Sequence, residues 1–302
     1  MSVSAGKALS GTAFATLLLI ALMMGANHVA ARIAFNNGVD VATAVVFRST
    51  VTALVLFTLI AVQGVRIQLT ARHKRMLPVM GLLIGVQSLC LYSAVARLPV
   101  ALALLAFNTY PIWTALWSWA LYRHRPERPL VVAMPVILVG LGLALDVFGA
   151  ASGLGAQGQW LRIGTGVGFA LAAAATFGLA LVITQHEAGD VDGRVRTATT
   201  MTLAGLVALT MVVSQGGFHL PQAPAGWGGL LTLTVLYGTA FTIMFTVLPR
   251  LGVVGNSAIM NVEPVFALVL AWLILGQTIA PVQLLGALIV VVAVMVLGMR
   301  RR

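Results

Sequence analysis

Charged residues are scarce in this chain of 302 residues. Only 8% of the residues are Asp, Glu, Lys or Arg, whereas soluble domains carry about 25%. That share is too small to coat a surface that faces water. Because 60% of the residues are hydrophobic and the mean hydropathy is +1.02, we expect most of the protein to lie in a lipid bilayer.

Acidic residues and cysteine are scarcer still. Seven Asp and Glu stand against 18 Lys and Arg, which gives a formal net charge of +11. The basic residues punctuate apolar segments and form no basic domain, so a nucleic acid is not expected as a partner. The single cysteine, Cys90, excludes a disulfide within the chain.

The motifs of pumps and hydrolases are absent as well. The sequence has no Walker loop, no His/Cys/Asp cluster with the spacing of a metal site, and no Gly-x-Ser-x-Gly or His-Glu-x-x-His motif. The cytoplasmic loops are too short for a soluble catalytic domain. We therefore expect no enzyme activity, no catalytic residues, and neither a metal nor another cofactor.

Long apolar runs are what the sequence does contain. A helix needs about 20 mainly apolar residues to span a bilayer, and these runs lack the alternation of membrane β-strands. The first run is long enough to span, so we expect a retained helix rather than a cleaved signal peptide. The runs predict an all-α polytopic membrane protein with ten transmembrane helices, at 13–35, 41–63, 77–97, 100–122, 130–148, 163–185, 196–215, 228–249, 253–275 and 281–299.

The basic residues predict the orientation of these spans. If the N-terminus lies inside, 14 of the 18 Lys and Arg fall in cytoplasmic segments. Arg97 and Arg162 lie at outer ends, and Arg32 and Arg48 lie within spans. This asymmetry follows the positive-inside rule and predicts that both termini are cytoplasmic.

The second half of the sequence repeats the first. RLPVALALLAFNTYPIWTALWSWALY begins at Arg97, and RLGVVGNSAIMNVEPVFALVLAWLIL begins at Arg250, 153 residues later without a gap. Matches between polar residues, prolines and tryptophans in one register indicate a true repeat. The matched pairs include Asn108 with Asn261, Pro111 with Pro264, Trp119 with Trp272, Gly25 with Gly178, and Gly85 with Gly238.

An odd number of spans in each copy predicts that the copies are inverted. Five spans return the chain to the opposite side, so two five-helix repeats, at 1–150 and 151–302, insert with opposite topology. Secondary transporters built in this way bind substrate near the midplane, between the halves. The paired glycines are expected where helices approach closely, and one chain with both halves is expected to be able to work as a monomer.

Three stretches carry a resemblance to a known family. They are NVEPVFALVLAWLILGQT from Asn261, MGANHVAARIA from Met24 and VVFRST from Val45. With two five-span halves that each hold Asn-x-x-Pro, the whole chain resembles EamA-type members of the drug/metabolite transporter superfamily. Met24 replaces a tryptophan of the family pattern, His28 a phenylalanine and Gln277 an acid. The resemblance implies a ten-helix carrier of a bacterial plasma membrane that, in many members, exports amino acids or related metabolites.

Two ionisable residues within spans are the first candidates for a substrate site. An ionised group at bilayer depth costs a few kcal/mol or more, so it usually faces a cavity or a partner. Glu263 lies near mid-depth, and Pro264 frees a carbonyl beside it. Glu263 would recognise an amine or carry a proton, and Arg48 would bind a carboxylate. The alternative is a structural role for both, with Glu263 tied to Arg48 or to a helix end.

Polar and aromatic side chains of other spans complete the predicted site, and each has a structural alternative. Aromatic residues line a pocket or pack against helices, the two asparagines bind substrate or cap the carbonyls that the prolines release, and His28 relays a proton or fills the core. The predicted substrate-binding residues are His28, Arg48, Tyr92, Tyr110, Trp113, Tyr237, Asn261 and Glu263. The predicted helix-break residues are Asn108, Pro111 and Pro264.

These features favour a secondary-active or facilitative carrier that exports amino acids or similar small molecules by alternating access. A zwitterion needs one protein group of each sign, and Arg48 and Glu263 supply them. The alternative is efflux of drugs or organic cations, for which a buried acid and an aromatic cavity would suffice. A further alternative is a subunit that binds ligand without moving it. Small-molecule substrate and lipid are the expected partners.

Overall fold

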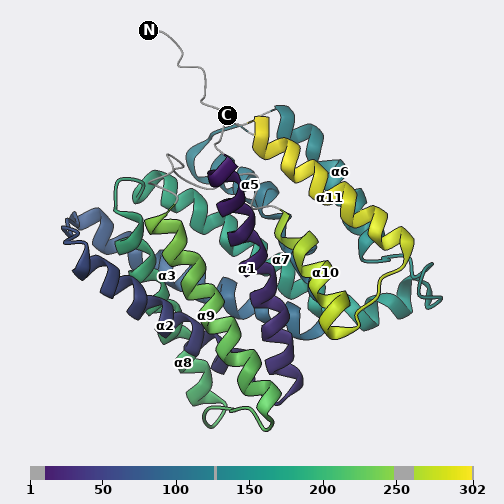
Figure 1. Cartoon of the computed structure of the whole chain (residues 1–302). Helices are drawn as coiled ribbons and strands as arrows, with labels where there is room; N and C mark the ends of the chain where they lie inside the picture. Colours follow the sequence, from purple (N-terminus) through teal and green to yellow (C-terminus); the bar gives the residue numbers. More distant parts are fainter. Residues whose placement is uncertain (1–10, 126–127, 248–261, 301–302) are drawn as a thin grey trace.

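The computed structural model describes residues 11–125, 128–247 and 262–300, and all the regular secondary structure in these ranges is helical (Figure 1). The predicted all-α class is therefore confirmed. In chain order the helices are α1 (Gly11–Asn36), α2 (Val41–Val62), α3 (Ala71–Arg97), α4 (Val100–Phe107), α5 (Tyr110–Tyr122), α6 (Arg128–Ala144), α7 (Gly155–Glu187), α8 (Gly193–Ser214), α9 (Pro224–Thr246), α10 (Glu263–Leu275) and α11 (Pro281–Arg300).

Most of these helices are long enough to cross a bilayer. Within the described ranges, seven stretches qualify by length and composition: α1, α2, α3, α4 with α5, α7, α8 and α9. Three shorter apolar helices fall within the remaining predicted spans, in α6, α10 and α11. The protein is thus a multi-pass membrane protein. The count of ten crossings and the cytoplasmic position of both termini stay predictions.

The helices recur with the offset found in the sequence. α5 and α10 each contain 13 residues and carry a proline in the first turn, Pro111 and Pro264. Each ends at a residue in the left-handed conformation, Arg123 with φ 57° and Gly276 with φ 62°. All these pairs are 153 positions apart, as are the first residues of α3 and α9 and of α6 and α11. The repeat found in the sequence is therefore also present in the structure.

The two halves interlock. α1 packs against α9 and α10, and its counterpart α7 packs against α3 and α5, which are the matching helices of the other half. α2 packs against α8, and α6 lies beside α11 at one edge of the molecule (Figure 1). Because each half supplies the packing partners of the other, the apolar core belongs to both.

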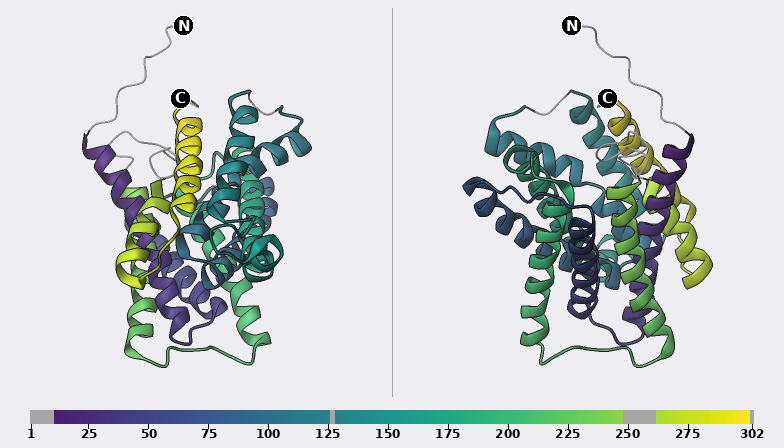
Figure 2. Two further views of the ribbon diagram at one scale, coloured as in Figure 1. Left: turned by 90° about the vertical axis from the view of Figure 1, so that its right-hand side faces the viewer. Right: turned by 60° about the vertical axis from the view of Figure 1, so that its left-hand side comes forward.

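The two ends of the molecule differ in charge. α1 begins and α11 ends at the same end (Figure 2). At the opposite end the α8–α9 link closes on the α1–α2 link, where Gln222 N donates to Asn37 O over 3.1 Å. We call the first end the basic end, because α3 and α8 begin there among residues such as Arg72 and Arg194. The charge distribution predicts that the basic end is cytoplasmic.

Glycine permits two equivalent close crossings. A Cβ placed on Gly178 of α7 would lie 2.8 Å from the backbone N of Thr114 in α5. A Cβ on Gly25 of α1 would lie 3.0 Å from the backbone N of Ala267 in α10. Thr114 and Ala267 are again 153 positions apart, so the predicted close approach of this glycine pair is confirmed on both sides of the duplication.

The second glycine pair, Gly85 and Gly238, does not behave alike in the two halves. A Cβ on Gly85 of α3 would lie 3.0 Å from Val207 Cβ in α8, as expected of a close crossing. The nearest atom to a Cβ on Gly238 of α9 would be Thr52 Oγ1, at 4.0 Å. The expected close approach is therefore wrong for Gly238, because α9 lies further from α2 than α3 does from α8.

The fourth predicted span is broken where its sequence suggests. α4 ends at Phe107 and α5 begins at Tyr110, with Pro111 in the first turn, where its missing N–H costs no helical hydrogen bond. We expected Asn108 either to bind substrate or to cap a released carbonyl. The structure gives the capping role to a neighbour, since Thr109 Oγ1 donates to Ala106 O over 2.8 Å and Asn108 Nδ2 has no partner.

Gly178→Ala should lower the thermal stability of the protein in detergent. The added methyl group meets backbone, which cannot swing away, and overpacking of this kind costs about 1–3 kcal/mol. Gly168→Ala on the same helix is the matched control, because nothing lies within 4 Å of a Cβ there. The control should hold its melting temperature or raise it, since alanine favours helix by up to about 1 kcal/mol over glycine. Equal behaviour of the two variants would contradict the close crossing.

Candidate functional site

Polar side chains from α1, α2, α3, α9 and α10 meet inside the apolar bundle. All of them except Tyr237 and Glu263 are buried, and the Glu263 side chain is only 27% exposed. We call this group the central polar cluster. Its members are Asn27, His28, Arg48, Gln87, Ser88, Tyr92, Tyr237 and Glu263.

Arg48 lies between two aromatic rings. Its Cζ is 4.6 Å from the centroid of Tyr92 and 4.1 Å from that of Tyr237, so both rings hold the cation by cation–π attraction. One hydrogen bond adds to this, from Arg48 Nη2 to Ser88 Oγ over 2.7 Å. Arg48 Nε has no partner, and no carboxylate in the described part of the chain forms an ion pair with the guanidinium.

Glu263 pairs with His28. The distance from His28 Nε2 to Glu263 Oε1 is 3.2 Å, and the imidazole meets the Tyr92 ring edge to face with centroids 5.7 Å apart. Tyr92 in turn donates its hydroxyl to Asn27 Oδ1 over 3.1 Å. A continuous series of contacts therefore runs from the Arg48 cation through Tyr92 and His28 to the Glu263 carboxyl.

The position of Glu263 explains how an acid is tolerated at this depth. It is the first residue of α10, where unpaired backbone N–H groups and the helix dipole favour an anion. Pro264 follows it and begins the helix without an N–H of its own. The alternative prediction of an Arg48–Glu263 tie is wrong, because His28 occupies the place of the partner.

Several buried polar atoms in this cluster lack a hydrogen-bond partner. They are Asn27 Nδ2, His28 Nδ1 and Arg48 Nε. All three side chains are buried, and an unsatisfied buried polar group costs about 1–3 kcal/mol. Such atoms are informative because a bound polar molecule would satisfy them, which favours a ligand-binding role for the cluster.

The residues at the repeat-related positions do not form a second cluster of this kind. The positions 153 residues away from Arg48, His28 and Tyr92 are held by Met201, Leu181 and Phe245. The counterpart of Glu263 is Tyr110, which packs with Phe107 and Phe177 at centroid distances of 5.8 and 5.3 Å. The scaffold is duplicated, but the polar cluster is not.

The structure groups most of the predicted site residues and separates others from them. His28, Arg48, Tyr92, Tyr237 and Glu263 meet in the cluster. Trp113 packs against α7 beside Gly178, and its neighbour on the same face, Trp117, donates Nε1 to Ala175 O over 3.0 Å. Tyr110 belongs to the aromatic group described above. Asn261 lies outside the described residues.

The list of predicted substrate-binding residues does not include three members of the cluster. Asn27 precedes His28, Ser88 lies four residues before Tyr92, and Gln87 precedes Ser88. The spacing of four places Ser88 and Tyr92 on one helix face, and this signal was available in the sequence. Among the described residues, no three His, Cys, Asp or Glu side chains gather as a metal site would require.

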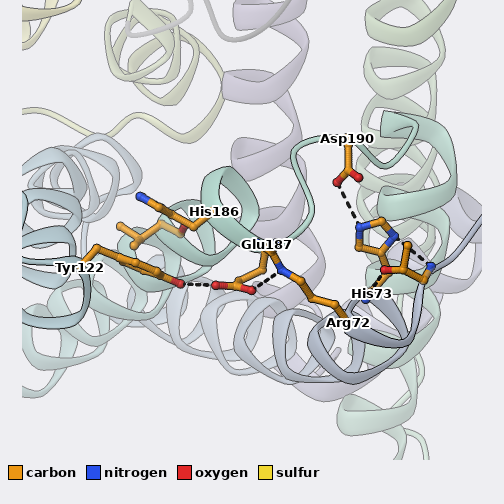
Figure 3. Close-up of polar contacts among 8 residues, drawn as sticks. Arg72, His73, Tyr122, His186, Glu187 and Asp190 are labelled. Carbon is orange, nitrogen blue, oxygen red and sulfur yellow. Dashed lines mark hydrogen bonds and ion pairs between the residues drawn. The ribbon is translucent and has the colours of Figure 1, made fainter.

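A second polar group joins the halves at the basic end (Figure 3). Glu187 at the end of α7 accepts hydrogen bonds from Arg72 Nε over 2.6 Å and from the Tyr122 hydroxyl over 2.7 Å. Beside it, His73 Nε2 lies 3.0 Å from Asp190 Oδ1. Each contact links the first half to the second. We call these five residues the basic-end latch.

An apolar cluster backs the latch. It is formed by α2 and α3 of the first half and by α7, the α7–α8 link and α8 of the second. The basic end is therefore closed by a polar layer over an apolar layer. The buried members of the apolar layer are Leu56, Ile60, Leu77, Met80, Ile183, Ala188, Val191, Val195 and Ala198.

The next acid along the chain also fixes the basic end. Asp192 precedes α8 and accepts from the backbone N of Arg194 over 2.8 Å. Hydrogen bonds from the Arg194 side chain hold the pKa of Asp192 below its usual value, and burial opposes this only in part. Arg194 also donates to Gln63 at the end of α2, which adds another link between the halves.

Comparison with known proteins agrees with this architecture. The protein is 25% identical over 214 residues to the threonine/homoserine exporter RhtA of Escherichia coli, an alignment that covers 69% of this chain and 66% of RhtA. The chain thus spans slightly less than two thirds of that relative's length. The RhtA of Salmonella typhimurium is 24% identical over 218 residues, covering 71% of this chain and 68% of the relative.

A transporter of uncharacterized function from Synechocystis is 25% identical over 227 residues, which cover 72% of this chain and 64% of that protein. A solved crystal structure superposes with a TM-score of 0.62 over 96% of this chain and 99% of the other, at 17% identity, and supports the fold alone. The EamA-like transporter family matches twice, over residues 11–145 and 164–299. These two matches cover most of the sequence, and the chain belongs to the EamA-like transporter family.

Proposed function

We propose that this membrane transporter exports amino acids, and that small hydroxyl-bearing ones of the threonine and homoserine type are its leading substrates. One observation carries the proposal. Arg48 is a buried cation without a carboxylate partner among the described residues, at one end of a series of contacts that ends at the Glu263 carboxyl. An amino acid brings both missing partners, a carboxylate and an ammonium.

Arg48 is suited to the substrate carboxylate. A guanidinium carries five N–H donors in a planar fork that matches a carboxylate, and the bond to Ser88 uses only one of them. The two tyrosine rings lie against the guanidinium and restrain its plane. Charge-assisted bonds in such a desolvated place are among the strong ones.

Glu263 is suited to the substrate ammonium. His28 approaches only Oε1 at ion-pair distance, which leaves Oε2 for a second donor. If the neutral His28 donates from Nε2 to Glu263, its Nδ1 becomes an acceptor. That atom and the Asn27 Nδ2 donor are both unpartnered, and together they complement a hydroxyl, which donates to one and accepts from the other.

The relatives support the same class of substrate. RhtA is named as an exporter of threonine and homoserine, two amino acids with a side-chain hydroxyl. The relatives from Escherichia coli and Salmonella also support a bacterial plasma membrane as the location that we propose.

We further propose that transport proceeds by alternating access, with the basic-end latch as the inner gate. The latch joins the halves through Arg72, Tyr122 and Glu187. The inverted repeat supplies two similar bodies that can rock against each other. Substrate would reach the central polar cluster from the cytoplasm only after these contacts separate.

Efflux of organic cations is the second candidate. The aromatic group of Phe107, Tyr110 and Phe177 favours it, because a cation with apolar rings would find both stacking partners and the Glu263 carboxyl. Such a substrate carries no carboxylate for Arg48 to bind. Growth of cells in cationic dyes, with and without the transporter, tests this candidate directly.

Counterflow of labelled L-threonine into loaded proteoliposomes should fall sharply in Arg48→Lys and in Glu263→Gln. Lysine keeps the charge but loses the fork, and glutamine keeps the shape but loses the charge. Each change removes a charge-assisted bond worth about 1.5–3 kcal/mol, so a roughly tenfold to hundredfold loss is expected.

Arg162→Lys is the control, because Arg162 is an exposed arginine at the start of α7. It should transport like the wild type. Wild-type activity in Arg48→Lys would remove the carboxylate-binding role. Dye resistance that survives in Arg48→Lys and disappears in Glu263→Gln would select organic-cation efflux instead.

Glu187→Gln should open the basic end. The change weakens both bonds of the latch to α7, and about 1.4 kcal/mol of lost cross-half interaction shifts a two-state equilibrium about tenfold. In a Cys90→Ala background, a cysteine at buried Ile183 should then react faster with a thiol reagent applied to the cytoplasmic side. Asp146→Asn is the control, since it removes an acid that takes no part in the latch and accepts from the backbone N of Ala151 and Ser152. An unchanged rate in Glu187→Gln would show that the latch does not hold the gate.

A further inference from the structure

A cavity of about 510 Å³ lies at the end of the molecule opposite the basic end. It lies where α1 and α3 end, where α2 begins and where α8 ends. We call it the outer cavity. Its lining residues are Phe35, Asn36, Val39, Asp40, Val41, Ser93, Ala96, Arg97, Met211 and Gln215. Its volume is within the range of about 300–1,000 Å³ that is usual for small-molecule sites.

The outer cavity brings together two charges of opposite sign. Asp40 uses Oδ1 to cap α2 by accepting from Thr43 N over 2.9 Å. Its other oxygen, Oδ2, is shielded from solvent and has no hydrogen-bond partner, and His219 Nδ1 lies 3.9 Å from it. The carboxylate therefore has an oxygen available for a donor that the protein does not supply.

Arg97 has donors to spare. Its Nη1 donates to Ser93 O over 2.9 Å, and its Cζ lies 4.8 Å from the centroid of the Phe169 ring of α7. In the described part of the chain it forms no ion pair. Arg97 is thus held by one bond and one ring, whereas Arg48 in the central polar cluster is held by one bond and two rings.

One pair of aromatic rings separates the two places. Phe35 lines the outer cavity, and its ring meets Tyr92 of the central polar cluster with centroids 5.8 Å apart. A molecule that leaves the central polar cluster toward this end would meet the cavity next.

We infer that the outer cavity is a second binding site for a small zwitterion, with the ammonium at Asp40 and the carboxylate at Arg97. The inference rests on the proposed function for its choice of ligand. An amino acid in transit would then be held once in the central polar cluster and again beyond the Phe35–Tyr92 pair. External amino acid would bind there as well.

Protection of a cysteine from a thiol reagent tests this site without any transport. Ala96 lines the cavity and is half-buried, so Ala96→Cys in a Cys90→Ala background places a small reporter beside Arg97. A membrane-impermeant methanethiosulfonate applied to intact cells should label it. External L-threonine should slow the labelling. Threonine methyl ester, which lacks the carboxylate, and 2,3-dihydroxybutanoate, which lacks the ammonium, should not.

Asp40→Asn is the decisive second variant. Asparagine caps a helix as well as aspartate does, so the start of α2 should persist while the charge is lost. The concentration of L-threonine that halves the labelling rate should rise about tenfold, as expected from one lost charge-assisted bond. Ser152→Cys in the exposed α6–α7 link is the control, and its labelling should not respond to L-threonine.

Three outcomes would overturn the inference: labelling of Ala96→Cys that needs permeabilised cells, labelling that L-threonine leaves unchanged, or protection that Asp40→Asn retains in full. Protection in a protein that shows no counterflow would instead support the outer site while the proposed export of L-threonine fails. Cysteine protection therefore tests the outer site, and counterflow tests the proposed export, independently of each other.

Discussion

The interior of this protein is organised around one buried guanidinium. A cation at bilayer depth is costly, and here it is held by two tyrosine faces and one serine hydroxyl rather than by an acid. Cation–π attraction in a desolvated place is worth about 2 kcal/mol or more per ring, which offsets part of that cost and leaves most of the donors unused. These contacts require α2, α3 and α9 to converge at Arg48. The same convergence brings His28 and Glu263 close through Tyr92.

Much of this arrangement was predictable because lipid makes polar residues conspicuous. Arg48 and Glu263 stand out in spans that have almost no other charges. The break between α4 and α5 follows from proline chemistry at Pro111, and the close crossing at Gly178 follows from the repeat. In each case one residue's own physical chemistry dictates the feature, so no knowledge of its neighbours is needed.

The features that were missed depend on how helices are placed relative to one another. The pairing of His28 with Glu263 requires that α1 crosses α10 near Gly25, and spacing within one helix does not reveal that crossing. The basic-end latch was not predicted for a related reason. Its acids and bases lie at the ends of apolar runs, where charges are expected to face water, so their mutual contacts leave no signal in the sequence.

The register of α5 with α10 has a consequence for what a duplicated protein can bind. Two identical chains around a twofold axis would place the same side chain on both sides of the centre, so a central arginine would face its own copy. Like charges at that depth repel, and such a pair could never offer one group of each sign. When both halves belong to one chain, equivalent positions can differ. Met201 occupies the position equivalent to Arg48, and Tyr110 occupies the position equivalent to Glu263. A symmetric frame with unlike halves can thus hold one cation and one acid near its centre without a second copy of either.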